Sequence, residues 1–251
     1  MDAMTLYAIL AALVGLLVGS FLNVVIYRVP LGENIAFPAS HCTRCNHPLK
    51  WYHNIPLFSW LFLRGKCAFC GEPISKQYPI VEFINALIWL MLFIKVGPVW
   101  WFPFVAASFS ALFALSMIDF KYFAVPDSVN FFALGTALIS PALFHMDMSN
   151  SIVRALLAAG GLWMIGFLVS KVARKEAMGS ADVIVAGTMA ALLGFPNFFI
   201  ALFLSAILAI FPSLFAKDTM VPFVPFLALA TLIVYLFDAQ AAQLIHWIIY
   251  R

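Results

Sequence analysis

Long apolar runs separated by short polar segments dominate this sequence. Because a hydrocarbon core needs about 20 consecutive apolar residues per helix, the runs predict membrane-spanning helices. Proline and glycine mark several of the divisions between them, as at Gly97-Pro98, Pro126 and Pro222. We place eight predicted spans at residues 5–27, 79–95, 99–118, 128–145, 152–171, 181–195, 197–216 and 221–237.

The composition agrees with this pattern. Of the 251 residues, 65% are hydrophobic and 10% are charged, and the mean hydropathy is +1.02. A soluble domain has about 45–50% apolar and about 25% charged residues, so this chain has too few charges to cover a core with a wetted surface. We therefore expect an all-α polytopic protein embedded in the lipid bilayer. The net charge of +3 gives no reason to expect a nucleic-acid partner.

The basic residues indicate how the chain crosses the membrane. With the N-terminus outside, the inner loops are residues 28–78, 119–127, 172–180 and 217–220. Together with Lys171 at the membrane edge, these loops carry eleven of the 14 basic residues. The positive-inside rule therefore places them in the cytosol. We divide the chain into a retained first helix (1–27), a cytosolic domain (28–78), a membrane core (79–238) and an interfacial tail (239–251).

The cytosolic domain contains all four cysteines, as Cys42-Thr-Arg-Cys45 and Cys67-Ala-Phe-Cys70. Each C-x-x-C pair supplies two thiolates from one tight turn, and four thiolates complete a tetrahedral zinc site. Two disulfides are the alternative, which the reducing cytosol disfavours. Four protein ligands leave no position for a reacting water, so we predict a small domain around a structural Zn²⁺.

Two aspartates lie at the cytosolic ends of predicted membrane helices. Asp119 ends the third span and Asp182 begins the sixth. Two carboxyl groups at one depth can share a proton, so that one activates a water and the other protonates a substrate carbonyl, as in aspartyl proteases. Helix capping or ion pairing is the alternative for each. A proton-coupled transporter would also use such acids, but no inverted repeat is visible.

Three other features have plausible structural explanations. Asp127, between Pro126 and a predicted helix, suits a helix N-cap. Gly15 and Gly19 form a GxxxG pattern that favours close helix packing. Glu82 lies within a predicted membrane helix, and its structural explanation is pairing with a base such as Lys76.

Several longer motifs together resemble one family. They are Gly19-Ser-Phe-Leu-Asn23, Gly65-x-Cys67-x-x-Cys70, Tyr78-Pro79-x-Val81-Glu82, Ile118-Asp119, Glu176-Ala-Met-Gly179-Ser-Ala-Asp182 and Pro222-Phe-Val-Pro225-Phe226. Their arrangement is similar to that of bacterial type IV prepilin peptidases, the leader peptidases and N-methyltransferases of type IV pilus and type II secretion systems. The resemblance implies an inner-membrane enzyme with a periplasmic N-terminus and its active site at the cytosolic face. It implies catalytic roles for Asp119 and Asp182, prepilin or pseudopilin substrates, and S-adenosylmethionine as methyl donor. For the methylation, Glu82 is a candidate partner of the substrate amine.

The chain departs from the family pattern at a few positions. Ala181 stands where the family's GxGD motif has its second glycine. If that glycine needs a positive φ, alanine costs about 1 kcal/mol or more; if it only gives clearance, alanine is tolerated. Val224 replaces an expected glycine, and Lys121 an expected acid. We expect an active peptidase, with a non-cleaving zinc-containing assembly protein or a methyltransferase without protease activity as alternatives.

The basic residues of the cytosolic domain suggest one further hypothesis. They would attract an acidic group of the substrate just past the cleavage site, and the candidates are Arg28, Arg64, Lys66 and Lys76.

Overall fold

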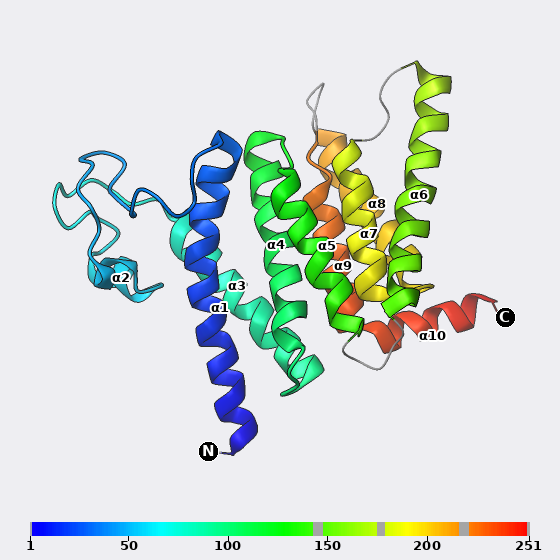
Figure 1. Ribbon diagram of the computed structural model, residues 1–251, viewed down its shortest axis with the longest axis horizontal. Coiled ribbons are helices and arrows are strands. Elements are labelled where there is room, and N and C mark those ends of the chain that lie inside the picture. The colour runs from blue at the N-terminus through cyan, green and yellow to red at the C-terminus, as the bar shows by residue number, and fades with distance from the viewer. Residues whose placement is uncertain (1, 143–147, 175–178, 216–220, 250–251) are drawn as a thin grey trace. The chain divides into compact units, whose positions relative to one another are not determined.

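The computed structural model describes residues 2–142, 148–174, 179–215 and 221–249, and these residues contain helices but no strand (Figure 1). The chain separates into two compact units, Met1–Pro98 and Val99–Arg251, each with its own packed helices. The predicted all-α class is confirmed.

In the first unit, α1 (Ala3–Arg28) packs against α3 (Gln77–Val96). A Cβ added to Gly15 would lie 2.8 Å from Trp89 Cβ, and one added to Gly19 would lie 2.7 Å from Glu82 Cα. The GxxxG pattern therefore lets the two helices approach closely, as predicted. Three short elements lie between α1 and α3: η1 (Val29–Leu31), η2 (Trp51–Asn54) and α2 (Phe58–Phe62).

In the second unit, α5 packs against both α4 and α7, and α9 packs against α4, α7 and α8 (Figure 1). Small buried side chains allow these close contacts, among them Ala106, Ala133 and Ala190, none of which is exposed. The helices of this unit are α4 (Phe102–Tyr122), α5 (Asp127–Ala142), α6 (Met148–Ala173), α7 (Ser180–Leu193), α8 (Asn197–Phe215), α9 (Val224–Leu236) and α10 (Asp238–Ile249).

A helix lies at each of the eight predicted spans, but the count of eight spans is not confirmed. Five helices in the described residues are long and apolar enough to cross a membrane, which makes this a multi-pass membrane protein. In contrast, α5, α7 and α9 have only 16, 14 and 13 residues. The predicted tail forms α10, and its place at the membrane interface stays a prediction.

Candidate active site and metal centre

Asp119 lies near the C-terminal end of α4, and its side chain is only 7% exposed. The backbone amide of Val224, the first residue of α9, donates a 3.1 Å hydrogen bond to Asp119 Oδ2. The Phe223 amide also hydrogen-bonds to this carboxyl group. Amides at a helix N-terminus favour a negative group, so the start of α9 is well suited to hold the Asp119 carboxylate.

The motif Pro222-Phe-Val-Pro225-Phe226 explains why a helix starts beside Asp119. Pro225 lies in the first turn of α9, where its missing N–H costs no intrahelical bond. Val224 lies inside the helix and is 1% exposed, so a positive φ is not required where the family has glycine. The motif therefore starts a helix whose first amides face Asp119.

Asp182 is the third residue of α7 and is partly buried. The Gly179 backbone hydrogen-bonds to its carboxyl group, and its own amide donates to the Gly179 carbonyl at 3.2 Å. The Asp119 and Asp182 carboxyl groups lie close enough to repel each other electrostatically. The structure thus brings together two acids that are 63 residues apart in the sequence.

Ala181 lies within α7 and does not have a positive φ. Alanine at this position therefore causes no backbone strain, which answers the question raised by the altered GxGD motif. Its carbonyl oxygen accepts a 3.1 Å hydrogen bond from Asn130 Nδ2, on α5. Sequence reasoning missed Asn130, although a polar residue within a predicted membrane helix was a usable signal.

Asp127 and Lys121, two other residues from the sequence analysis, have less specific environments. Asp127 lies in the first turn of α5, within one residue of the predicted cap. Lys121 Nζ lies 4.9 Å from the centre of the Tyr122 ring. Glu176 lies outside the described residues.

The four cysteine sulfurs lie within 4.8 Å of one another, and all four cysteines are free thiols. The two C-x-x-C turns repeat the same backbone pattern. The amides of Cys42 and Cys67 donate to the carbonyls of His47 and Glu72, at 3.0 and 2.8 Å. A residue with positive φ follows the second cysteine of each pair: Asn46 in one turn, Gly71 in the other.

This cluster fits a tetrahedral metal site. With metal–sulfur bonds of about 2.3 Å, tetrahedral geometry requires sulfurs about 3.8 Å apart, and Cys42 Sγ and Cys70 Sγ are 3.9 Å apart. Hydrogen bonds from the backbone of Cys45 and then Arg44 lower the pKa of Cys42 to about 6. The Glu72 backbone hydrogen bond lowers the pKa of Cys70, but burial and the three other cysteines outweigh it and raise that pKa to about 12. The first turn therefore favours one thiolate, the positive charge of a metal would favour the others, and the four cysteines could hold a metal ion.

Glu82 is buried in the first unit, with 7% of its surface exposed. Its Oε2 accepts a 2.8 Å hydrogen bond from the Leu57 amide, and the Ser20 hydroxyl also hydrogen-bonds to the carboxyl group. Among the described residues Glu82 has no ion pair, so the predicted pairing with Lys76 is wrong. The hydrogen bond to Leu57 instead ties the start of α2 to the second turn of α3.

Arg28 is also buried, with 7% exposed. Its guanidinium donates to the carbonyl oxygens of Asn34 and Pro38, at 3.0 and 2.8 Å. It therefore holds the chain that follows α1, which makes it a poor candidate for binding a substrate acid. Arg64, Lys66 and Lys76 are exposed.

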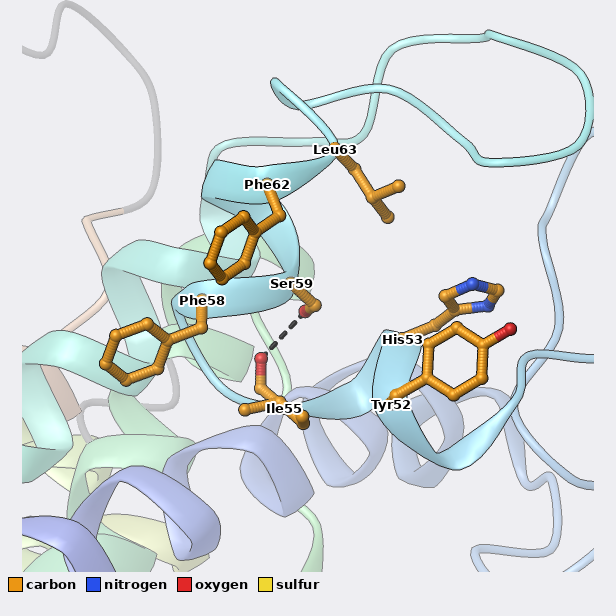
Figure 2. Close-up of a pocket in the computed structure, with 7 residues that line it drawn as sticks. All are labelled: Tyr52, His53, Ile55, Phe58, Ser59, Phe62 and Leu63. Atoms are coloured by element: carbon orange, nitrogen blue, oxygen red, sulfur yellow. Dashed lines mark hydrogen bonds between the residues drawn. The ribbon is translucent and has the colours of Figure 1, made fainter.

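An apolar pocket of about 300 Å³ opens beside α2 in the first unit (Figure 2). Tyr52 and His53 of η2 line it together with Phe58 and Phe62 of α2. It contains neither aspartate and no cysteine, so it is separate from both sites described above.

Comparison with known proteins identifies the family. Residues 13–96 match the model of the bacterial peptidase A24 N-terminal domain, and residues 106–214 match that of the type IV leader peptidase family. The chain belongs to this peptidase family. The first match contains the four cysteines and Glu82, and the second contains Asp119, Asn130 and Asp182.

Relatives support the assignment over most of the chain. Proteins named prepilin leader peptidase/N-methyltransferase from Dichelobacter nodosus and Aeromonas hydrophila are 33% and 30% identical to this chain. The matches cover 92% of both chains for the first, and 90% of this chain and 89% of the relative for the second. A protein of the same name from Myxococcus xanthus is 38% identical over 75% of this chain and 56% of its own length. No solved structure matches the chain.

Proposed function

We propose that this protein is a membrane aspartyl endopeptidase that removes the leader of type IV prepilins or type II secretion pseudopilins. The observation that carries the proposal is the convergence of Asp119 and Asp182, at the ends of two helices of the second unit that both pack against α5 and α9. Membership of a leader peptidase family supplies the substrate class.

The contacts of the two acids suggest separate roles. Hydrogen bonds from backbone amides favour the ionised form of a carboxyl group. Asp119 receives them from Val224 and Phe223 at the start of α9, whereas Asp182 receives one, from Gly179. We assign Asp119 as the base that takes a proton from the attacking water. Asp182 then holds the shared proton and donates it to the peptide carbonyl. Since water attacks directly, no covalent intermediate with the protein forms.

The second proposed activity is methylation of the new N-terminal amine, with S-adenosylmethionine as the methyl donor. It is supported by the printed names of the relatives. The metal proposed for the four cysteines is Zn²⁺ in a structural role, since four thiolates leave no open coordination position. It would order a segment that contains few helical residues.

We also propose that the aspartates and the cysteines face the cytosol of a bacterium, with the N-terminus in the periplasm. The asymmetry of basic residues supports this orientation. It places the aspartates on the side where a prepilin leader lies, at the depth where its hydrophobic helix begins.

The test is leader removal from a purified prepilin in detergent, followed by mass spectrometry. Wild type should cleave, and both Asp119→Asn and Asp182→Asn should not. Asp127→Asn is a matched control at another helix end, and it should cleave like wild type because asparagine also suits a helix N-terminus. Zinc-loaded wild type that leaves several prepilins uncut, or an Asp182→Asn variant that still cuts, would overturn the proposal. Methylation is scored separately, as the mass of one added methyl group.

A further inference from the structure

The side chain of Asn130, on α5, hydrogen-bonds to the backbone at the start of α7. The bond is to Ala181, the residue directly before Asp182. The Asn130 side chain is fully buried, and Nδ2 donates to the Ala181 carbonyl at 3.1 Å. A carbonyl oxygen can only accept, so the amide must present its nitrogen there. This contact therefore also fixes the direction of the amide oxygen, Oδ1.

Apart from the hydrogen bond between the Gly179 backbone and the Asp182 carboxyl group, the start of α7 has no side-chain cap. Its N-cap is Gly179, which has no side chain and so makes no side-chain cap. The first amides of a helix have no intrahelical partners, and an uncapped first turn frays readily. Because Asp182 lies in that turn, the bond from Asn130 holds the backbone that carries the carboxyl group.

The other half of the same amide is unsatisfied. Asn130 Oδ1 is buried and has no hydrogen-bond partner among the described residues. A buried acceptor without a donor is unfavourable and calls for an explanation. The described residues contain three such oxygens, those of Asn23, Asn130 and Asn197, and only that of Asn130 belongs to a side chain bonded to the residue before Asp182. A donor that arrives with the substrate would satisfy it.

We propose that Asn130 is a positioning residue of the active site, an inference that rests on the proposed peptidase function. Nδ2 fixes the first turn of α7 and thereby the direction of Asp182. Oδ1 accepts a hydrogen bond from a backbone N–H of the bound substrate or from the attacking water.

The experiment compares Asn130→Leu, Asn130→Asp and a matched control. Ser108→Ala is the control, because Ser108 is fully buried too and its hydroxyl makes a comparable bond between helices. It donates from α4 to the Ala133 carbonyl of α5 at 2.9 Å. Misplacing a reacting group costs about 100-fold in rate. We expect a loss of that order in kcat for Asn130→Leu and little change for Ser108→Ala, at similar thermal stability.

Asn130→Asp separates positioning from folding. A protonated aspartic acid can donate to the Ala181 carbonyl and still offer an acceptor, whereas the ionised form cannot donate and adds a charge near Asp182. Its activity relative to wild type should therefore fall as pH rises, while the ratio for Asn130→Leu stays flat. The ionisable groups at this end of the packed helices, among the described residues, are Asp119, Lys121, Tyr122, Asp127, Lys171, Arg174 and Asp182.

The outcomes distinguish this inference from the proposed function. If wild type does not cleave, the proposed function fails. If wild type cleaves and Asn130→Leu keeps its kcat, the positioning role is wrong. A higher KM for Asn130→Leu assigns Oδ1 to a substrate N–H, and an unchanged KM assigns it to the attacking water. Should Asn130→Leu not fold, a flat pH ratio for Asn130→Asp would overturn the inference.

A second inference concerns the first unit and rests on different contacts. Trp51 of η2 and Phe58, Leu61 and Phe62 of α2 are exposed apolar side chains, and we call this set the α2 surface. Trp51 is 80% exposed and Phe62 is 84% exposed. Phe58 and Phe62, one turn apart, point to the same side of α2 (Figure 2).

Two observations indicate what covers the α2 surface. The hydrogen bond from the Leu57 amide to Glu82 holds the start of α2 against the second turn of α3, a membrane helix of the same unit. Exposed basic residues, Arg64 and Lys66, follow α2 directly. Aromatic side chains beside basic ones are typical of segments that lie in a membrane interface with anionic lipids.

We infer that the α2 surface inserts into the headgroup region of an anionic bilayer. The test is a photo-crosslinking amino acid at position 62, in the full-length protein reconstituted with phosphatidylglycerol. Phe37, in the same unit and 76% exposed, is the control position. Adducts with lipid acyl chains are expected at 62 and not at 37. Crosslinks from 62 into residues 99–251 or to a second copy of the chain, or equal lipid labelling at 37, would overturn the inference.

Discussion

Replacing Gly19 by alanine should loosen the contact between α1 and α3. The added Cβ would lie 2.7 Å from Glu82 Cα and 3.1 Å from the Glu82 carbonyl oxygen. Both atoms belong to a helix backbone, which cannot rotate away as the end of a long side chain can. The two helices must therefore move apart to accept one methyl group.

The expected cost follows from two opposing effects. Overpacking costs about 1–3 kcal/mol, whereas alanine gains about 1 kcal/mol over glycine in helix propensity. Gly160 on α6 is the matched control, because a Cβ there meets no atom within 4 Å and alanine brings only the propensity gain. Gly160→Ala should thus be neutral or slightly stabilising, and the difference between the two variants, about 1–3 kcal/mol, measures the overpacking alone.

The assay is the free energy of unfolding of both variants in one detergent, with zinc content measured alongside. Because Glu82 also holds the start of α2 through Leu57, Gly19→Ala should release the proposed zinc more readily than Gly160→Ala. Equal stability of the two variants would refute the close approach of α1 and α3 described above.

Three further expectations concern single residues or the metal. Ala181→Gly should bring no gain in activity and should lower stability by about 0.5–1 kcal/mol, since the position is helical; thermal unfolding and leader cleavage check both parts, and faster cleavage would contradict it. Arg28→Met should leave the carbonyls of Asn34 and Pro38 without their donor, so limited proteolysis should cut residues 29–40 faster than in wild type. Chelation of the metal should increase proteolysis of residues 40–74 while α1 and α3 stay protected, and Cys42→Ser should reproduce this without chelator.

The sequence predicted where the helices lie better than how they pack. Apolar runs and prolines predicted the position of a helix at each of the eight proposed spans to within a few residues, and the spacing of the cysteines predicted a cluster that the structure contains. In a membrane helix, however, the lipid-facing side is as apolar as the buried side. The sequence therefore carries little information on which face of α5 meets α7.

The sequence analysis missed several contacts of the site for the same reason, because residue type does not show which helix faces meet. Asn130 was not identified because a single polar residue does not reveal its partner on another helix. The amide of Val224 donates to Asp119, which is 105 residues away in the sequence. Because this donor is a backbone N–H, the residue type at position 224 does not indicate it. Glu82 was considered as an ion-pair partner, whereas its partners are the Leu57 amide and the Ser20 hydroxyl.

The division of the chain at residue 98 has a consequence for its evolution and its use in the laboratory. The boundary between the compact units falls in the gap between the two family matches, which end at residue 96 and begin at residue 106. Both aspartates and the donors described for them come from the second unit, and all four cysteines come from the first. The cysteine-bearing unit could therefore be replaced during evolution without a change in the residues that hold the two carboxyl groups. In the laboratory, the turn after Gly97 is a suitable place to split the protein into two co-expressed fragments.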